Sequence, residues 1–391
     1  MVRAAKLISV IAFNRRFFNA AATAVLALGV PPGVAAQREA SAPWAERLLQ
    51  ELPRIDADSR ARLGVYVRDL DTGVSVSWHA DQRWYIASMV KVPVAIAVLR
   101  GVERGQYTLD TTVTLRASDY VDGAGLTNNH PVGTPLGIRF LLEQMLIYSD
   151  NTASDMLIDL VGIAEVNAVV EELAPEGGFR RITSLGDVRR MIYGQLVADT
   201  DKLRGQDLLA LNRQRVDAER LQMLSALTDT PVARFRLSTL DAAYNAYYAS
   251  GVNSARLDAY GELLVQLVEG RALQPTTTDY LLKLMDRVAT GARRIKAGLP
   301  PGVRFAHKTG TQRRRVCDAG LLRFTEAGRA RRAIVVACAR DEPALALSES
   351  ALAQVGAALC QSGLLTEGIA NAPHCHVLPP ARGIVVPAAG R

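Results

Sequence analysis

Segments with the alternation typical of β-strands stand at both ends of this 391-residue chain, and helical segments fill the middle. Residues 62–69 and 74–78 alternate apolar and polar side chains around an Asp71-Thr72-Gly73 turn signal. The C-terminal strand-like segments are residues 303–307, 318–324 and 332–338. The pattern predicts an α/β (α+β) fold, in which both termini build one antiparallel sheet with flanking helices and a helical lobe.

The composition agrees with a large folded core, since 49% of the residues are hydrophobic and 22% are charged. The length allows one large domain or two modest ones. Hydrophobic periodicity predicts helices over residues 44–52, 88–99, 136–172 (several helices), 203–227, 240–249, 256–269, 277–288 and 348–360.

The N-terminus has the pattern of an export signal. A basic stretch with Arg15 and Arg16 precedes an apolar run, and Val34-Ala35-Ala36 fits a cleavage site, so residues 1–36 are predicted to be a signal peptide. The paired arginines fit a twin-arginine signal, and an ordinary Sec signal remains the alternative. Either route predicts a periplasmic or secreted protein without stable membrane insertion after cleavage. Residues 37–370 would form the folded domain, and 371–391 a flexible tail.

The net charge of +7 does not by itself indicate nucleic-acid binding, because the basic residues are mostly scattered. The densest run, Arg313-Arg314-Arg315, is explained more simply by attraction of a substrate that carries a carboxylate. We therefore expect a small-molecule substrate and no nucleic-acid partner.

Four cysteines, Cys317, Cys338, Cys360 and Cys375, occupy the last quarter of the chain and lack the spacing of a zinc site. A hairpin around residues 326–329 would place Cys317 nearly opposite Cys338, and Cys360 could then pair with Cys375. Four unpaired cysteines are the alternative. No metal or other cofactor is expected.

Ser88-Met89-Val90-Lys91 begins a nearly apolar helical segment. Residues three apart share a helix face, so the Lys91 amine can approach the Ser88 hydroxyl. Burial of the amine would lower its pKa and make it a usable base for the serine. An SxxK motif alone also occurs by chance, as a surface serine beside a solvated lysine.

Two further motifs follow in order. Ser149-Asp150-Asn151 lies between helical segments, where it could relay a proton and hold a substrate amide, or simply cap a helix. His307-Lys308-Thr309-Gly310-Thr311 follows a strand, and its amine and hydroxyls suit a carboxylate ligand. Gly310 would allow the substrate backbone to approach closely.

The ordered set SxxK, SDN and KTG resembles class A β-lactamases and penicillin-binding proteins over roughly residues 44–362. The resemblance implies that Ser88 attacks a lactam carbonyl, that Lys91 activates it, and that Ser149 protonates the leaving nitrogen. Asn151 would orient the substrate amide, and Lys308, Thr309 and Thr311 would hold the carboxylate. The backbone N–H groups of Ser88 and Thr311 would form an oxyanion hole. Tyr120 would stand at the edge of the site.

The chain departs from this pattern after the SDN motif. Class A enzymes carry a deacylating Glu in an ExxLN motif there, and an ungapped match from residues 182–185 puts Arg189 in its place. Asp187 or Asp207 could substitute, or both could be ordinary loop or capping acids. Extra residues at about 189–252 read as helices, either as a lid or as a structural elaboration.

Three functions remain open from the sequence. The first is an exported serine hydrolase that opens β-lactams through a Ser88 acyl-enzyme. The second is a D,D-peptidase or esterase of the penicillin-binding type, acting on a peptidoglycan-like peptide. The third is a module that becomes acylated and does not turn over.

Overall fold

The computed structural model describes residues 42–378, so the expectations for residues 1–36 and for most of the tail lie outside the described range. No helix within that range is long and apolar enough to cross a bilayer. The helices are α1 (Pro43–Asp58), α2 (Lys91–Glu103), α3 (Ile138–Ile147), α4 (Asn151–Val161), α5 (Ile163–Leu173), α6 (Leu185–Tyr193), α7 (Gly205–Arg213), α8 (Asp217–Thr228), α9 (Leu240–Ala249), α10 (Leu257–Val268), α11 (Pro275–Asp286), α12 (Ile295–Gly298) and α13 (Leu345–Gln361).

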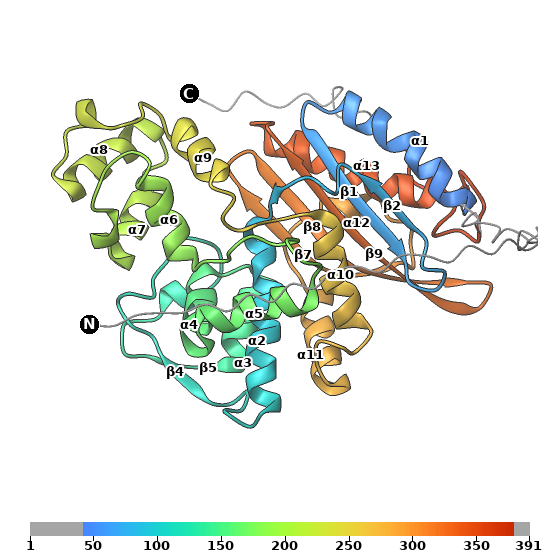
Figure 1. The fold of residues 1–391 in the computed structure, drawn as a ribbon, viewed down its shortest axis with the longest axis horizontal. Coiled ribbons are helices and arrows are strands. Elements are labelled where there is room, and N and C mark those ends of the chain that lie inside the picture. The colour runs from blue at the N-terminus through green and yellow to red at the C-terminus, as the bar shows by residue number, and fades with distance from the viewer. Residues whose placement is uncertain (1–41, 379–391) are drawn as a thin grey trace, which may run out of the picture. The chain divides into compact units, whose positions relative to one another are not determined.

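The predicted sheet from both ends of the chain is confirmed (Figure 1). Its strands are β1 (Arg62–Asp69), β2 (Ser75–Trp78), β7 (Arg304–Gln312), β8 (Arg315–Glu326) and β9 (Arg329–Arg340). They run antiparallel in the order β2-β1-β9-β8-β7, so β7 is an edge strand. Two short ribbons join β3 (Trp84–Tyr85) to β6 (Ser254–Ala255) and β4 (Thr112–Thr114) to β5 (Pro135–Gly137).

The two faces of the sheet support separate cores. Along β1, Leu63, Val65 and Val67 pack in one core with side chains of α1, α12 and α13, whereas Tyr66 belongs to the other. Strand alternation produces this division, because successive side chains point to opposite faces. The second core contains α2 to α5, α10 and α11. Helix α2 is therefore buried on nearly all sides, as its continuous apolar sequence predicts.

The prediction of one helix over residues 203–227 is wrong. The chain leaves the helical conformation at Gln214 and Val216, which are both extended, and α7 and α8 result. The Arg220 guanidinium donates to the Gln214 carbonyl at 2.7 Å and bridges the break. Helix α6 begins directly after residues 182–184, because Ser184 caps it by accepting from the Asp187 N–H.

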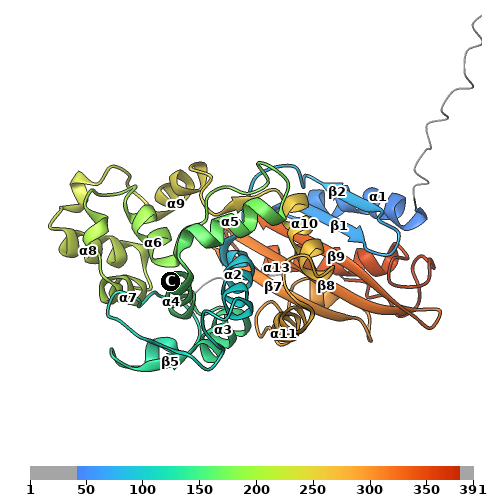
Figure 2. The same ribbon diagram turned by 60° about the horizontal axis from the view of Figure 1, so that its bottom comes forward.

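Helices α6 to α9 form an inserted lobe, which we define as residues 185–252, and Figure 2 shows it beside α4, at the end of the folded domain opposite α1. The lobe has a hydrophobic core of its own, which also includes Tyr85 and Ala87. These two residues lie within three positions of Ser88. The lobe therefore packs directly on the segment that leads to the predicted nucleophile.

Candidate active site

Ser88 lies in a single 3-10 turn (Ala87–Val90) that leads directly into α2. The preceding residue, Ala87, has a φ of 48°, a left-handed conformation that is costly for a residue with a side chain. The Ile86 N–H donates to the Asn253 carbonyl at 3.1 Å, and the Tyr260 hydroxyl donates to the Met89 carbonyl at 2.9 Å. These two hydrogen bonds hold the turn from both sides. Strained backbone of the kind found at Ala87 is common at active sites.

Lys91 is fully buried at the first position of α2. Its amine donates to the Ser149 carbonyl at 2.6 Å, to Asn151 Oδ1 at 2.7 Å and to Ser149 Oγ at 3.3 Å. Burial lowers the pKa of Lys91 to about 7, although the nearby carboxylates of Asp150 and Asp155 raise it. A substantial fraction of Lys91 is therefore an uncharged amine near pH 7.

Ser88 itself is partly accessible, and its hydroxyl has no hydrogen-bond partner among residues 42–378. The predicted contact between Ser88 and Lys91 is therefore absent here, since the amine is committed to Ser149 and Asn151. Catalytic hydrogen bonds often tighten only when substrate is bound, so this geometry leaves Lys91 eligible as the base.

The SDN motif is confirmed as the junction between α3 and α4, and it supports the site in two ways. Ser149 has a φ of 64°, which turns the chain sharply before the helix begins. Asp150 then caps α4 by accepting from the Ala153 N–H at 2.9 Å, and it also accepts from the Thr127 N–H at 3.0 Å. A side chain at Gly125 would collide with the Asp150 carboxylate, so this glycine permits the close approach of the loop.

Lys308 reaches the same serine from the edge strand β7. Its amine donates to Ser149 Oγ at 3.0 Å and to the Thr309 carbonyl at 3.1 Å. Burial, and then the neighbouring charge of Lys91, lower the pKa of Lys308 well below its usual value. We call Lys91, Ser149, Asn151 and Lys308 the amine cluster, in which two buried amines share one hydroxyl.

Gly310 has a different role from the one predicted. A side chain here would collide with the Ile86 carbonyl, so the glycine lets the protein's own segment before Ser88 approach β7. The two threonine hydroxyls already have protein partners. Thr309 Oγ1 is 2.6 Å from Thr290 Oγ1, and Thr311 Oγ1 accepts from Arg294 at 2.7 Å.

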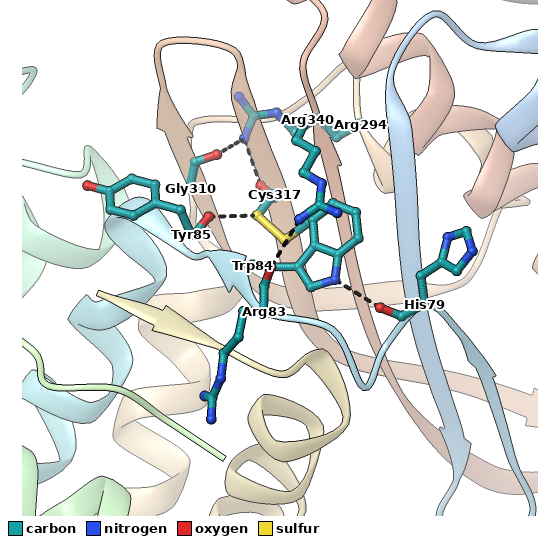
Figure 3. The surroundings of a disulfide bond; sticks show 9 residues. His79, Arg83, Trp84, Tyr85, Arg294, Gly310, Cys317 and Arg340 are labelled. Carbon is teal, nitrogen blue, oxygen red and sulfur yellow. Dashed lines mark hydrogen bonds between the residues drawn. A yellow bond between two sulfur atoms is a disulfide. The ribbon is translucent and has the colours of Figure 1, made fainter. Parts of the chain in front are cut away.

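Sequence reasoning missed Arg294. Its guanidinium is buried behind β7 and donates to the carbonyls of Gly310 and Cys317 at 3.1 and 2.9 Å (Figure 3). Glu349 on α13 balances its charge at 3.2 Å. Arg294 thus places a fixed positive charge next to Thr311. The only signal in the sequence is an Arg293-Arg294 pair, and nothing local tells which of the two is buried.

Both predicted disulfides are present, Cys317–Cys338 and Cys360–Cys375. The first joins β8 to β9 with Cα atoms 4.1 Å apart, and Cys317 Sγ lies 3.7 Å from the Tyr85 carbonyl (Figure 3). This disulfide therefore lies under the segment that leads to Ser88. Within the described range, the single cluster of potential metal ligands is Cys360, His374 and Cys375, and its two sulfurs are joined to each other.

Three residues named from the sequence lie outside the site. Tyr120 is only 4% exposed and donates its hydroxyl to the His130 carbonyl, so it does not form an exposed edge. Asp187 is half-exposed on α6 and pairs with Arg190 at 3.1 Å. Asp207 accepts from the Arg204 N–H at the start of α7, which is the capping role of an ordinary acid.

The arginine run after Thr311 serves the inserted lobe rather than a substrate carboxylate. Arg313 forms a paired contact with Asp217 of α8 at 2.6 and 3.1 Å, and it also contacts Asp241 of α9. Arg314 donates to the same Asp241 at 2.6 Å. The Tyr248 hydroxyl donates to the Arg313 carbonyl at 2.8 Å. These contacts dock the lobe on the β7–β8 turn.

Arg189 lies inside α6 and is buried against Asp122. Its Nε and Nη2 donate to the two carboxylate oxygens at 2.7 and 2.8 Å. The Asp122 carboxylate raises the pKa of Arg189 well above its usual value, in opposition to the effect of burial. The position matched to the family glutamate therefore carries a permanent positive charge.

The fold and the site together define a class of protein. A helix-borne serine and lysine, a second serine and a lysine on an edge strand are the parts of a serine hydrolase of the penicillin-recognising type. The model of the beta-lactamase enzyme family matches residues 46–362, and the chain belongs to this family. It is a class A β-lactamase-like serine hydrolase, as the three motifs predict.

Similar proteins agree with this assignment. A β-lactamase of Mycobacterium tuberculosis is 29% identical over 272 residues, which cover 70% of each chain. A solved β-lactamase from Xanthomonas campestris has a similar fold, with a TM-score of 0.61 and 21% identity over 81% of this chain and 97% of that one. The structure of PBP-A gives a TM-score of 0.59 and 21% identity, with 81% and 95% covered.

Proposed function

We propose that the protein is exported and that it opens β-lactams through an acyl-enzyme on Ser88. The observation that carries this proposal is the Lys91 amine, which is fully buried one helical turn after Ser88 and has a pKa lowered to about 7. In this mechanism the amine takes the Ser88 proton as the hydroxyl oxygen attacks the lactam carbonyl. The left-handed Ala87 supports the presentation of Ser88 at the accessible end of the turn.

Ser149 is the proton donor to the leaving nitrogen in this proposal. Its hydroxyl lies 3.3 Å from the Lys91 amine and 3.0 Å from the Lys308 amine. A proton taken from Ser88 by Lys91 can therefore pass through Ser149 to the nitrogen, and Lys308 keeps the hydroxyl oriented. The C–N bond of the lactam breaks as the nitrogen receives that proton.

The substrate carboxylate binds at β7 in this proposal. Lys308, Thr309 and Thr311 are the predicted ligands, and the buried charge of Arg294 lies next to Thr311. The N–H groups of Ser88 and Thr311 remain the proposed oxyanion hole.

A second function is favoured by one observation. Arg189, paired with Asp122, occupies the place matched to the deacylating glutamate, so that position offers no carboxylate to activate water. This arrangement supports a long-lived acyl-enzyme. The protein would then be a D,D-peptidase of the penicillin-binding type on a peptidoglycan-like peptide, or a module that stays acylated.

The test uses a fluorescent penicillin and a chromogenic cephalosporin. Wild type should either turn over the cephalosporin or keep the penicillin label, and Ser88→Ala should do neither. Ser238→Ala, an exposed serine of the lobe, is the matched control and should behave as wild type. Rapid colour without stable label supports a β-lactamase, whereas stable label without colour supports the second function. Wild-type colour and wild-type label in Ser88→Ala would refute the proposal.

Export has its own test. Expression of the full chain with its N-terminus, followed by fractionation and mass spectrometry, should give a periplasmic or secreted product that begins near residue 37. Replacement of Arg15 and Arg16 by lysine should block export by the twin-arginine route and leave Sec export intact. A product that keeps Met1 in the cytoplasm would contradict the proposal.

A further inference from the structure

The buried pair of Arg189 and Asp122 is connected to the Lys91 amine through one residue. The Asp122 carbonyl accepts from Asn151 Nδ2 at 2.5 Å, and Asn151 Oδ1 accepts from the Lys91 amine at 2.7 Å. A side chain at Gly123 would come within 2.7 Å of Asn151 Nδ2, so this glycine allows the contact. Four residues therefore form a continuous chain of hydrogen bonds from α6 to the predicted base.

The other end of this chain is also fixed. The Asp155 carboxylate of α4 accepts from the backbone N–H groups of Leu185 and Gly186, both at 2.7 Å. Helix α4 thus holds the start of α6, and Arg189 of α6 holds the Asp122 loop. That loop in turn holds Asn151, the first residue of α4. These contacts join α4, α6 and the loop that contains Asp122 into one hydrogen-bonded network around Lys91.

A buried ion pair is costly to form, because both charges lose their hydration. Arg189 and Asp122 have side chains only 14% and 10% exposed. The pair is bidentate, a geometry that fixes direction as well as distance. Such a pair at the wall of the site is suited to positioning more than to general stability.

We propose that Arg189, paired with Asp122, is a positioning residue that holds Asn151 against the Lys91 amine, so that Lys91 acts as the base at Ser88 without help from a glutamate. This inference rests on the proposed function, because it assigns a role to Lys91 in the attack by Ser88. Arg189 then has a role of its own, in addition to standing where class A enzymes carry the deacylating glutamate.

The charges around Lys91 agree with this role. Asp150 and Asp155 of α4 raise the pKa of Lys91, and Arg189 of α6 lowers it. The amine of Lys308 on β7 is a further charged neighbour, and the two amines disfavour each other's protonation. The Asp122 carboxylate pairs with Arg189 and offsets part of the arginine's charge. A glutamate in the place of Arg189 would hold a proton on Lys91, whereas the arginine favours the neutral amine.

The experiment measures the rate of labelling of the full chain by a fluorescent penicillin between pH 5 and 9. Arg189→Gln and Asp122→Asn should each slow labelling at pH 7 by about 100-fold, the usual effect of a misplaced catalytic group. Arg189→Gln should also move the rising limb of the pH profile above 7, because a positive charge beside Lys91 is lost. In Arg189→Lys, the rising limb of the pH profile should lie near pH 7 again, but only part of the wild-type labelling rate should be recovered.

The control is Arg68→Gln, which removes a pair between Arg68 of β1 and Glu262 of α10 (2.9 Å), outside the amine cluster. This variant should keep the wild-type labelling rate and the wild-type rising limb of the pH profile. The proposal is overturned if the Arg189 and Asp122 variants match wild type in rate and pH profile, even with lower melting temperatures. If Arg189→Gln does not fold, Arg189→Lys and Asp122→Asn decide the question by the same criteria.

A separate measurement distinguishes this inference from the proposed function. The titration of Lys91 can be followed by NMR with ¹³C-labelled lysine in wild type and in Arg189→Gln and Asp122→Asn. Wild type that neither hydrolyses the cephalosporin nor becomes labelled would refute the proposed function alone. A Lys91 resonance that titrates identically in all three proteins would refute the positioning role, whatever the labelling shows.

Discussion

The amine cluster and the inserted lobe both adjoin the segment before Ser88, but different forces hold them there. The amine cluster consists of two buried amines, Asn151 and the partly exposed Ser149, which hydrogen-bond one another. The Cys317–Cys338 disulfide contacts Tyr85 in the segment before Ser88. The lobe contacts Tyr85 and Ala87 through apolar side chains and reaches the β7–β8 turn through ion pairs that are about one-third exposed.

This difference separates two tasks. Buried charges are poorly screened, so the amine cluster can keep perturbed pKa values at any ionic strength. Partly exposed ion pairs are individually weak and sensitive to salt. We therefore expect changes in the amine cluster to alter chemistry, and changes in the docking contacts to alter which substrates fit and how firmly they are held.

The largest effect should come from removing one amine. Lys91→Met keeps the length of the side chain but has no base, so labelling by a fluorescent penicillin should slow by about 10²- to 10⁴-fold. Stopped-flow fluorescence measures the rate. Lys296→Met, at an exposed lysine of α12, is the matched control. Retained labelling in Lys91→Met would show that another group is the base.

The disulfide beneath the site gives the next effect. Replacing Cys317 and Cys338 by serine should lower the free energy of unfolding by about 3 kcal/mol, as measured by urea denaturation. It should also slow labelling, because the Tyr85 segment loses a rigid support. The Cys360→Ser, Cys375→Ser variant is the comparison, and its labelling rate should stay unchanged. Equal labelling rates in the two variants would contradict this role.

The pH dependence follows from Lys91. Burial lowers its pKa from 10.5 to about 7, and only the neutral amine accepts a proton. The labelling rate should therefore rise about tenfold per pH unit below 7 and level off above it. A rising limb near pH 10, or a flat profile between pH 5 and 9, would refute Lys91 as the base.

The docking contacts should give the smallest effect. Asp241→Asn weakens the pairs with Arg313 and Arg314 and should raise KM about fivefold with kcat nearly unchanged, since such pairs contribute about 1 kcal/mol. In 1 M salt, wild type should approach the variant. Asp207→Asn alters a helix cap within the lobe without touching the turn, and it should leave KM unchanged. A KM independent of both salt and Asp241 would mean that the lobe does not influence the site.

Several features could be predicted because their causes are local. The alternation in residues 62–69 gave the bounds of β1, and the hairpin around residues 326–329 brought Cys317 opposite Cys338. The sequence also indicated Ser88, Lys91, Ser149 and Lys308 by motif spacing. Each of these features depends on neighbours a few residues away or on the register of a hairpin. Local spacing and hairpin register can both be inferred from the order of residues along the chain.

Other features depended on contacts between distant segments. The sequence match put Arg189 at the position of the expected glutamate. It could not reveal that Arg189 pairs with Asp122, which is 67 positions away. It assigned Gly310 to the substrate, whereas the Ile86 carbonyl fills that space. It interpreted Arg313-Arg314 as a substrate attractant, whereas two aspartates of the lobe already pair with them.

The sequence by itself thus determined the family, the sheet from both termini and the order of the reactive groups. The tertiary structure decided which charges neutralise each other and which amine is buried. The physical reason is that a charge acts through space on whatever lies within a few ångströms. Those neighbours are chosen by packing among α4, α6, β7 and the Asp122 loop, and no local pattern encodes that choice.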